Sequence, residues 1–150
     1  MIERKQLFRH RPLEGQIGDC HRTAIACLLD LEPETVPHFG LSDFDKEGRI
    51  TKHEQTTEAD AWLRERGMLC VHLAYPLPEL ADVLAWVGAS NPNVYWLLGG
   101  ASKIGVNHTV IARGRSIAWD PSLDDSGIVG PCDDGYFWAS FIVPAHQVAA

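Results

Sequence analysis

The chain has 150 residues, the usual size of one domain, and an acidic net charge of −7. Nucleic-acid-binding surfaces are rich in clustered Lys and Arg, so this charge argues against that class of function. No apolar run reaches the ~18 residues of a membrane-spanning helix, and no apolar segment follows the charges of residues 3–5, as a secretory signal would require. We therefore expect a single cytoplasmic domain, residues 1–150, that binds neither nucleic acid nor a membrane.

The first strong element is a helix that begins at Cys20. Apolar side chains recur along one of its faces, at Cys20, Ala24, Cys27, Leu28 and Leu31. Asp19 is the expected N-cap residue, and Glu32-Pro33 is the expected end. Cys20 then lies in the first turn, where a helix N-terminus favours the thiolate, the nucleophilic form of cysteine.

The rest of the chain divides into a helical part and a strand-rich part. A polar stretch over 42–56 is interpreted as a flap, and it precedes a predicted helix over 58–66, a strand over 69–73 and a helix over 79–87 that Gly88 ends. Predicted strands then follow over 94–98, 106–112, 116–119 and 136–143. Helices followed by an antiparallel sheet indicate an α+β domain whose sheet packs on the buried first helix.

His108 and Asp120 lie on the two predicted strands that flank Gly114. If a three-residue loop centred on Gly114 joins these strands, Ala112 pairs with Ser116 and His108 lies directly opposite Asp120. Directly opposed side chains share a face of the sheet at contact distance. Asp120 would then hold one imidazole nitrogen and leave the other for Cys20, which is the nucleophile, base and orienting acid of a catalytic triad.

Several short motifs carry a resemblance to a known family. Q-x-G-D-C ends at Cys20 and opens the helix, N-H-T-V contains His108, and W-D-P contains Asp120. This order resembles the papain-like cysteine peptidase fold, and G-D-C-x-R-T-A-I-A-C-L-L-x-L with V-P-H-F is similar to small bacterial and phage members of that clan. The resemblance implies that Cys20 is the nucleophile, His108 the base and Asp120 the orienting residue. It also implies that Gln16 and the Cys20 backbone amide are the oxyanion donors.

These features predict a thiol hydrolase, a cysteine peptidase or amidase, that cleaves an amide or related acyl bond of a peptide or protein through a Cys20 thioester. Two alternatives fit the same features. A thioester-based acyltransferase of the transglutaminase type would pass the acyl group to an amine. A non-catalytic papain-like module would retain the fold for partner recognition.

The remaining polar and aromatic candidates receive weaker roles. His21 and Trp119 are candidate residues of the cleft. His38 and His72 have no second Cys or His at metal spacing, so we expect surface or packing roles for them and expect no metal or other cofactor. The other cysteines are interpreted as structural: Cys27, Cys70 and Cys132.

Overall fold

The computed structural model describes residues 1–146, and it has the α+β architecture that the sequence predicts. The helices are α1 (Cys20–Leu28), α2 (Gln55–Arg64) and α3 (Leu80–Ser90). The strands are β1 (Met68–Tyr75), β2 (Tyr95–Ala101), β3 (Asn107–Arg113), β4 (Ser116–Trp119) and β5 (Phe137–Pro144). Within the described residues, no helix is long and apolar enough to cross a membrane.

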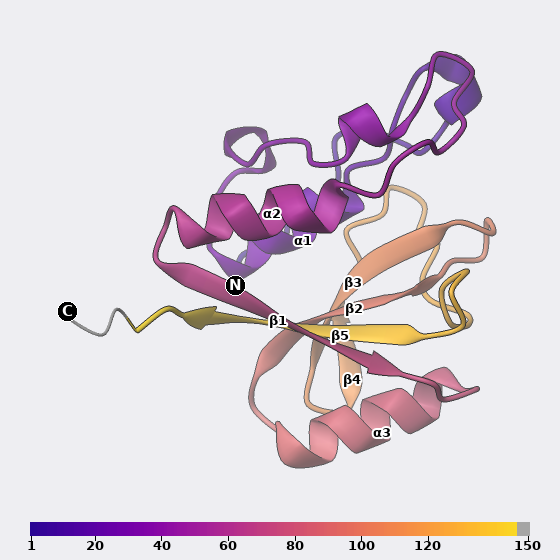
Figure 1. Ribbon diagram of the computed structural model, residues 1–150. Coiled ribbons are helices and arrows are strands. Elements are labelled where there is room, and N and C mark those ends of the chain that lie inside the picture. Colours follow the sequence, from indigo (N-terminus) through magenta and orange to yellow (C-terminus); the bar gives the residue numbers. More distant parts are fainter. Residues whose placement is uncertain (147–150) are drawn as a thin grey trace.

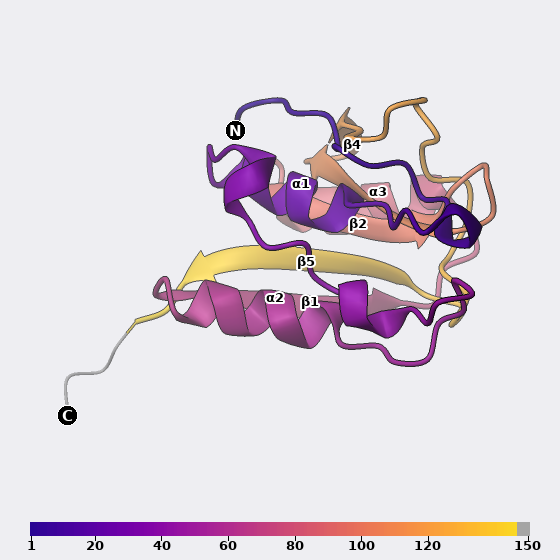
Figure 2. The same ribbon diagram turned by 90° about the horizontal axis from the view of Figure 1, so that it is seen from above.

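All five strands form one antiparallel sheet in the order β1-β5-β2-β3-β4. Helices α1 and α2 cover one face of it, and α3 covers the other (Figures 1 and 2). Successive side chains along a strand point to opposite faces of the sheet, so the same strands contribute to both cores. Leu97 and Ile111 pack toward α1 and α2, whereas Leu98 packs toward α3. Strand β1, from the helical half of the chain, also joins this sheet.

Helix α1 begins at Cys20 after Asp19, as predicted, but it ends earlier than predicted and lacks the capping bond. It ends at Leu28, and two residues later the chain turns through a left-handed conformation at Asp30 (φ 56°). The Asp19 side chain does not cap the helix. It is buried, accepts hydrogen bonds from the backbone N–H groups of Leu7 and Phe8, and pairs with Arg22 at 2.9 Å. Asp19 therefore fastens the N-terminal segment to α1.

Helix α3 also differs, because it begins after Glu79 and continues through Gly88 to Ser90. The prediction that Gly88 ends the helix is wrong. A Cβ atom at this position would lie 2.4 Å from the backbone carbon of Gly114. Gly88 is the point at which α3 touches the β3–β4 turn.

The predicted register of the β3–β4 hairpin is wrong, although the predicted contact between His108 and Asp120 is present. Arg113 pairs with Ser116, so the loop has two residues rather than three, and Ile111 pairs with Trp119 because a β-bulge shifts the register beyond Ala112. Continued past the bulge, this register sets Asp120 opposite Val110, two residues from His108. Residues two apart on a strand share a face, so the bulge brings Asp120 to the side of the sheet that carries His108.

Candidate active site

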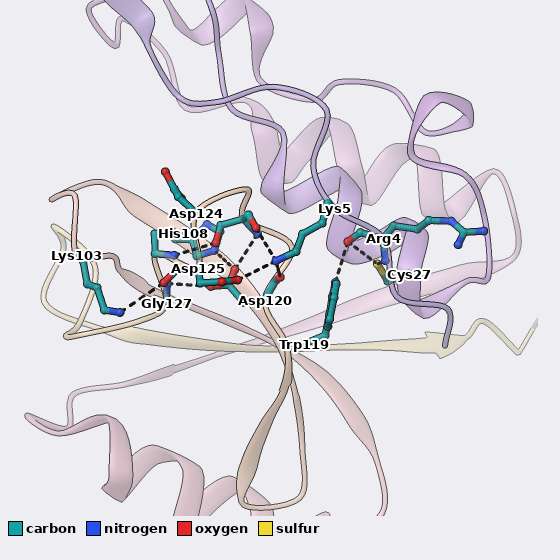
Figure 3. Close-up of polar contacts among 12 residues, drawn as sticks. Arg4, Lys5, Cys27, Lys103, His108, Trp119, Asp120, Asp124, Asp125 and Gly127 are labelled. Atoms are coloured by element: carbon teal, nitrogen blue, oxygen red, sulfur yellow. Dashed lines mark hydrogen bonds and ion pairs between the residues drawn. The ribbon is translucent and has the colours of Figure 1, made fainter.

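His108 and Asp120 form the predicted contact. The His108 Nε2 atom lies 2.7 Å from Asp120 Oδ1. The same carboxylate accepts hydrogen bonds from the backbone N–H groups of Ser122 and Gly127, both at 2.8 Å (Figure 3). With three donors around it, the carboxylate has a fixed orientation and holds the imidazole in one position.

Cys20, the first residue of α1, lies near His108. Both side chains line one cavity, and the Cys20 sulfur is close enough to contribute to the raised pKa of His108. Since Asp120 occupies Nε2, the nitrogen left for Cys20 is Nδ1. A second contact ties the first turn of α1 to β3, because His21 Nδ1 lies 3.4 Å from the hydroxyl of Thr109. The structure thus brings together Cys20, His108 and Asp120, from three separate parts of the sequence.

The electrostatics of this group favour the charged form of the imidazole. Burial of His108 disfavours the imidazolium, but the hydrogen bond to Asp120 and the nearby Cys20 sulfur outweigh it and raise the pKa of His108 to about 10. Burial alone would raise the pKa of Asp120, yet its hydrogen bond to His108 and those from Ser122 and Gly127 hold it well below the usual value.

The group opens into a cavity of about 870 Å³. Cys20 and His108 line it together with Gln6, His21 and Trp138. His21 is therefore a cleft residue, as predicted; burial, followed by the nearby His72, lowers its pKa to about 4, so it is neutral at physiological pH. A volume of this size falls within the range of small-molecule and cofactor pockets.

Two predicted residues do not reach the cavity. Gln16 pairs with Arg11 through backbone hydrogen bonds in both directions, and it is not among the residues that line the cavity. Trp119 packs in the core between the sheet and α1, where its Nε1–H donates to the Arg4 carbonyl at 2.8 Å. Two other glutamines, Gln6 and Gln55, lie in the cavity wall, and Gln6 Nε2 donates to the Phe8 carbonyl.

The loop before Cys20 is held by two histidines. His38 Nε2 donates to the Gly18 carbonyl at 3.2 Å, and His10 Nδ1 accepts from the Gly18 N–H at 3.3 Å. His38 also stacks on the Phe8 ring, so its predicted packing role is confirmed. These contacts fix the approach of the chain to the nucleophile candidate.

The loop after Asp120 is held by the N-terminal segment. Lys5 Nζ donates to the carbonyls of Asp120 and Ser122 and pairs with Asp125 at 2.9 Å (Figure 3). The Gln6 N–H adds a bond to the Pro121 carbonyl at 2.8 Å. Figure 2 shows this first segment, in indigo, running alongside α1. Nothing in the sequence pattern links residue 5 to residue 120, so this support was missed.

A second polar cluster was also missed. It consists of Asp60, Cys70, His72 and Ser140, of which His72 and Ser140 line the same cavity. A signal for it was present: residues 70 and 72 alternate on a predicted strand and therefore share a face.

Comparison of the chain with protein-family models, with curated proteins and with solved structures finds no match, so its function is argued from the geometry of the site.

Proposed function

We propose that this protein is a papain-like thiol hydrolase that cleaves an amide or related acyl bond through a thioester at Cys20. One observation carries the proposal: the His108 imidazole is hydrogen-bonded to Asp120 through Nε2, and it lines a cavity together with Cys20, the first residue of α1. Nucleophile, base and orienting acid in mutual contact are the signature of covalent acyl transfer.

The raised pKa of His108 supports an imidazolium at neutral pH, and the proposed reactive form pairs it with a Cys20 thiolate. The Cys20 thiolate attacks the carbonyl carbon and forms the C–S bond, and the carbonyl π electrons move to the oxygen. Collapse of this oxyanion breaks the C–N bond, and His108 donates its Nδ1 proton to the leaving amine. The imidazole, now neutral, takes a proton from water, whose hydroxide attacks the thioester and restores the free thiolate and the imidazolium.

The oxyanion forms beside the first turn of α1. Backbone N–H groups in the first turn of a helix lack intrahelical acceptors, and the Cys20 N–H is one of them. It is the proposed oxyanion donor. A side-chain donor from Gln16 is not part of this proposal, since Gln16 lies outside the cavity lining.

The reactivity of Cys20 tests the proposal. We expect iodoacetamide to alkylate Cys20 rapidly at neutral pH, and we expect His108→Ala to slow this labelling by an order of magnitude or more, because the imidazolium that stabilises the thiolate is gone. Cys132 is a matched control within the same protein, since it is similarly half-exposed and lines the same cavity. A sluggish Cys20, labelled no faster than Cys132, would instead favour a binding module.

Turnover of a peptide library provides the second measurement. Cys20→Ser should reduce kcat by several orders of magnitude while the circular dichroism spectrum stays unchanged. Adding a primary amine to the reaction separates hydrolysis from acyl transfer, because a transferase would yield the amide of that amine rather than the free acid. Retained activity in Cys20→Ser would remove Cys20 from the mechanism.

A further inference from the structure

Asp60 of α2 and Cys70 and His72 of β1 present their side chains to one another. Their ligand atoms all lie within 4.8 Å of one another. The shortest approach is 3.1 Å, between His72 Nε2 and Asp60 Oδ1, and the Cys70 sulfur lies 3.9 Å from His72 Nδ1. All three residues are only partly buried, so the cluster is accessible to solvent.

We propose that Asp60, Cys70 and His72 form a zinc site at the wall of the cavity. Thiolate, imidazole and carboxylate are the three ligand types that Zn²⁺ takes in proteins. Zinc–ligand bonds of about 2.0–2.3 Å in a tetrahedral site place ligand atoms roughly 3.3–3.8 Å apart. The ligand atoms now lie within 4.8 Å of one another, so side-chain shifts that draw them closer would be needed to reach that geometry.

Ser140 supplies the support that a histidine ligand requires. Its hydroxyl, buried on β5, lies 2.8 Å from His72 Nδ1. A serine hydroxyl can both donate and accept a hydrogen bond. It can therefore accept a hydrogen bond from Nδ1–H when Nε2 binds the metal. The ion would replace the proton that is now shared between His72 Nε2 and Asp60. Cys70 would release its thiol proton to solvent when it binds the metal.

The site has an open position and a route of entry. His72 and Ser140 line the cavity, so a fourth ligand, water or a donor atom of a bound molecule, reaches the ion from that side. Three protein ligands with one open position is the arrangement of zinc sites that bind or activate small molecules. The proposal does not depend on the role of Cys20, since metal binding is measured without any turnover.

Cobalt substitution tests the site directly. The protein is stripped of metal with a chelator, and the Cys20→Ser variant is used so that the sulfur beside His108 cannot bind the probe. We expect Co²⁺ to produce a thiolate-to-metal charge-transfer band and the visible spectrum of a tetrahedral ion, saturating near one equivalent. Zn²⁺ should displace it and raise the melting temperature. Adding Cys70→Ser should abolish the charge-transfer band, whereas the matched change Cys132→Ser should leave it intact.

Alkylation of the unmodified chain covers the case in which Cys70→Ser fails to fold. Zn²⁺ should slow the labelling of Cys70 by iodoacetamide at least tenfold and leave Cys132 unaffected, and His72→Gln should weaken this protection. A Co²⁺ band that survives Cys70→Ser, the absence of any band, or Cys70 labelling that zinc does not change would overturn the proposal. The Ser140, His72 and Asp60 contacts would then be a metal-free tie between β5, β1 and α2.

Discussion

At the scale of single residues, His108 links the stability of the fold to the proposed chemistry. Its imidazole is paired with the Asp120 carboxylate in a largely buried position. A group whose pKa differs between the folded and unfolded chain makes the free energy of unfolding depend on pH. The sign of that dependence follows from the direction of each shift.

The pKa of His108 rises on folding from 6.5 to about 10, so its contribution to stability is complete below pH 6.5 and is lost as the pH rises toward 10. The pKa of Asp120 falls from 3.8, so its contribution is present above that value and is lost only in strong acid. We predict that the loss of stability caused by His108→Gln is largest between about pH 4 and 6.5 and shrinks toward pH 10. Urea unfolding across this range measures it.

The matching control is a double-mutant cycle with Asp120→Asn, which removes the charge that favours the imidazolium. In that variant the effect of His108→Gln should vary much less with pH. A pH dependence that is the same with and without the Asp120 carboxylate would contradict the ion pair.

Some residues of the candidate site could be predicted from the sequence and others could not. Cys20, His108 and Asp120 were found because a helix start and two strand ends carry local signals. Gln16 was chosen because it is near Cys20 in the sequence, whereas in the structure its backbone pairs with Arg11 and it is not among the residues that line the cavity. Such a backbone bridge leaves no trace in composition or spacing.

At the scale of elements, the β3–β4 hairpin shows why a correct contact came from an incorrect register. Loop length and bulge each shift the pairing by one residue, and only their sum decides which face Asp120 occupies. Apolar alternation over the four residues of β4 is too short to reveal a bulge. The elements themselves were predictable, whereas the offsets between them were set by packing.

Helix α3 provides a test of packing against propensity. Gly88→Ala should favour the helix by up to about 1 kcal/mol. The new methyl group would, however, collide with the backbone of Gly114, and such overpacking typically costs about 1–3 kcal/mol. We predict a lower free energy of unfolding, measured in urea.

Gly130→Ala is the control, because nothing lies within 4 Å of the added Cβ. Its effect should stay within about 0.5 kcal/mol. Stabilisation by Gly88→Ala would mean that α3 and the β3–β4 turn separate easily, and that their contact contributes little to the fold.

At the scale of the whole molecule, the first and last thirds of the chain cooperate to build one site. Lys5 holds the backbone of the segment that carries Asp120, and Arg9 pairs with Asp124 at 2.8 Å in the same loop. The N-terminal segment is in turn fastened to α1 through Asp19. Asp120 and Cys20 therefore share one scaffold, although 100 residues separate them.

We predict that Lys5→Met lowers kcat about tenfold, because a loosened loop misplaces the Asp120 carboxylate and with it the His108 ring. As a positioning residue, Lys5 should also move the alkaline limb of the pH–rate profile to lower pH, since the imidazolium loses part of its partner. A general loss of stability would not cause that shift.

Lys103→Met is the matched control, since its ammonium makes one long contact of 3.4 Å, to the Asp125 carbonyl of the same loop. Both measurements should remain near the wild-type values. Equal effects of the two substitutions would assign them to net charge rather than to the support of Asp120.

The long separation between Cys20 and its partners also has a consequence during synthesis. His108 follows Cys20 by 88 residues. At a synthesis rate of about 5–20 residues per second, His108 therefore leaves the ribosome roughly 4–18 s after Cys20. Throughout that interval the nascent chain carries Cys20 without His108 and Asp120, the partners proposed for it. We therefore expect the proposed nucleophile to lack its activating partners until synthesis has passed Asp120 and strands β3 and β4 have paired.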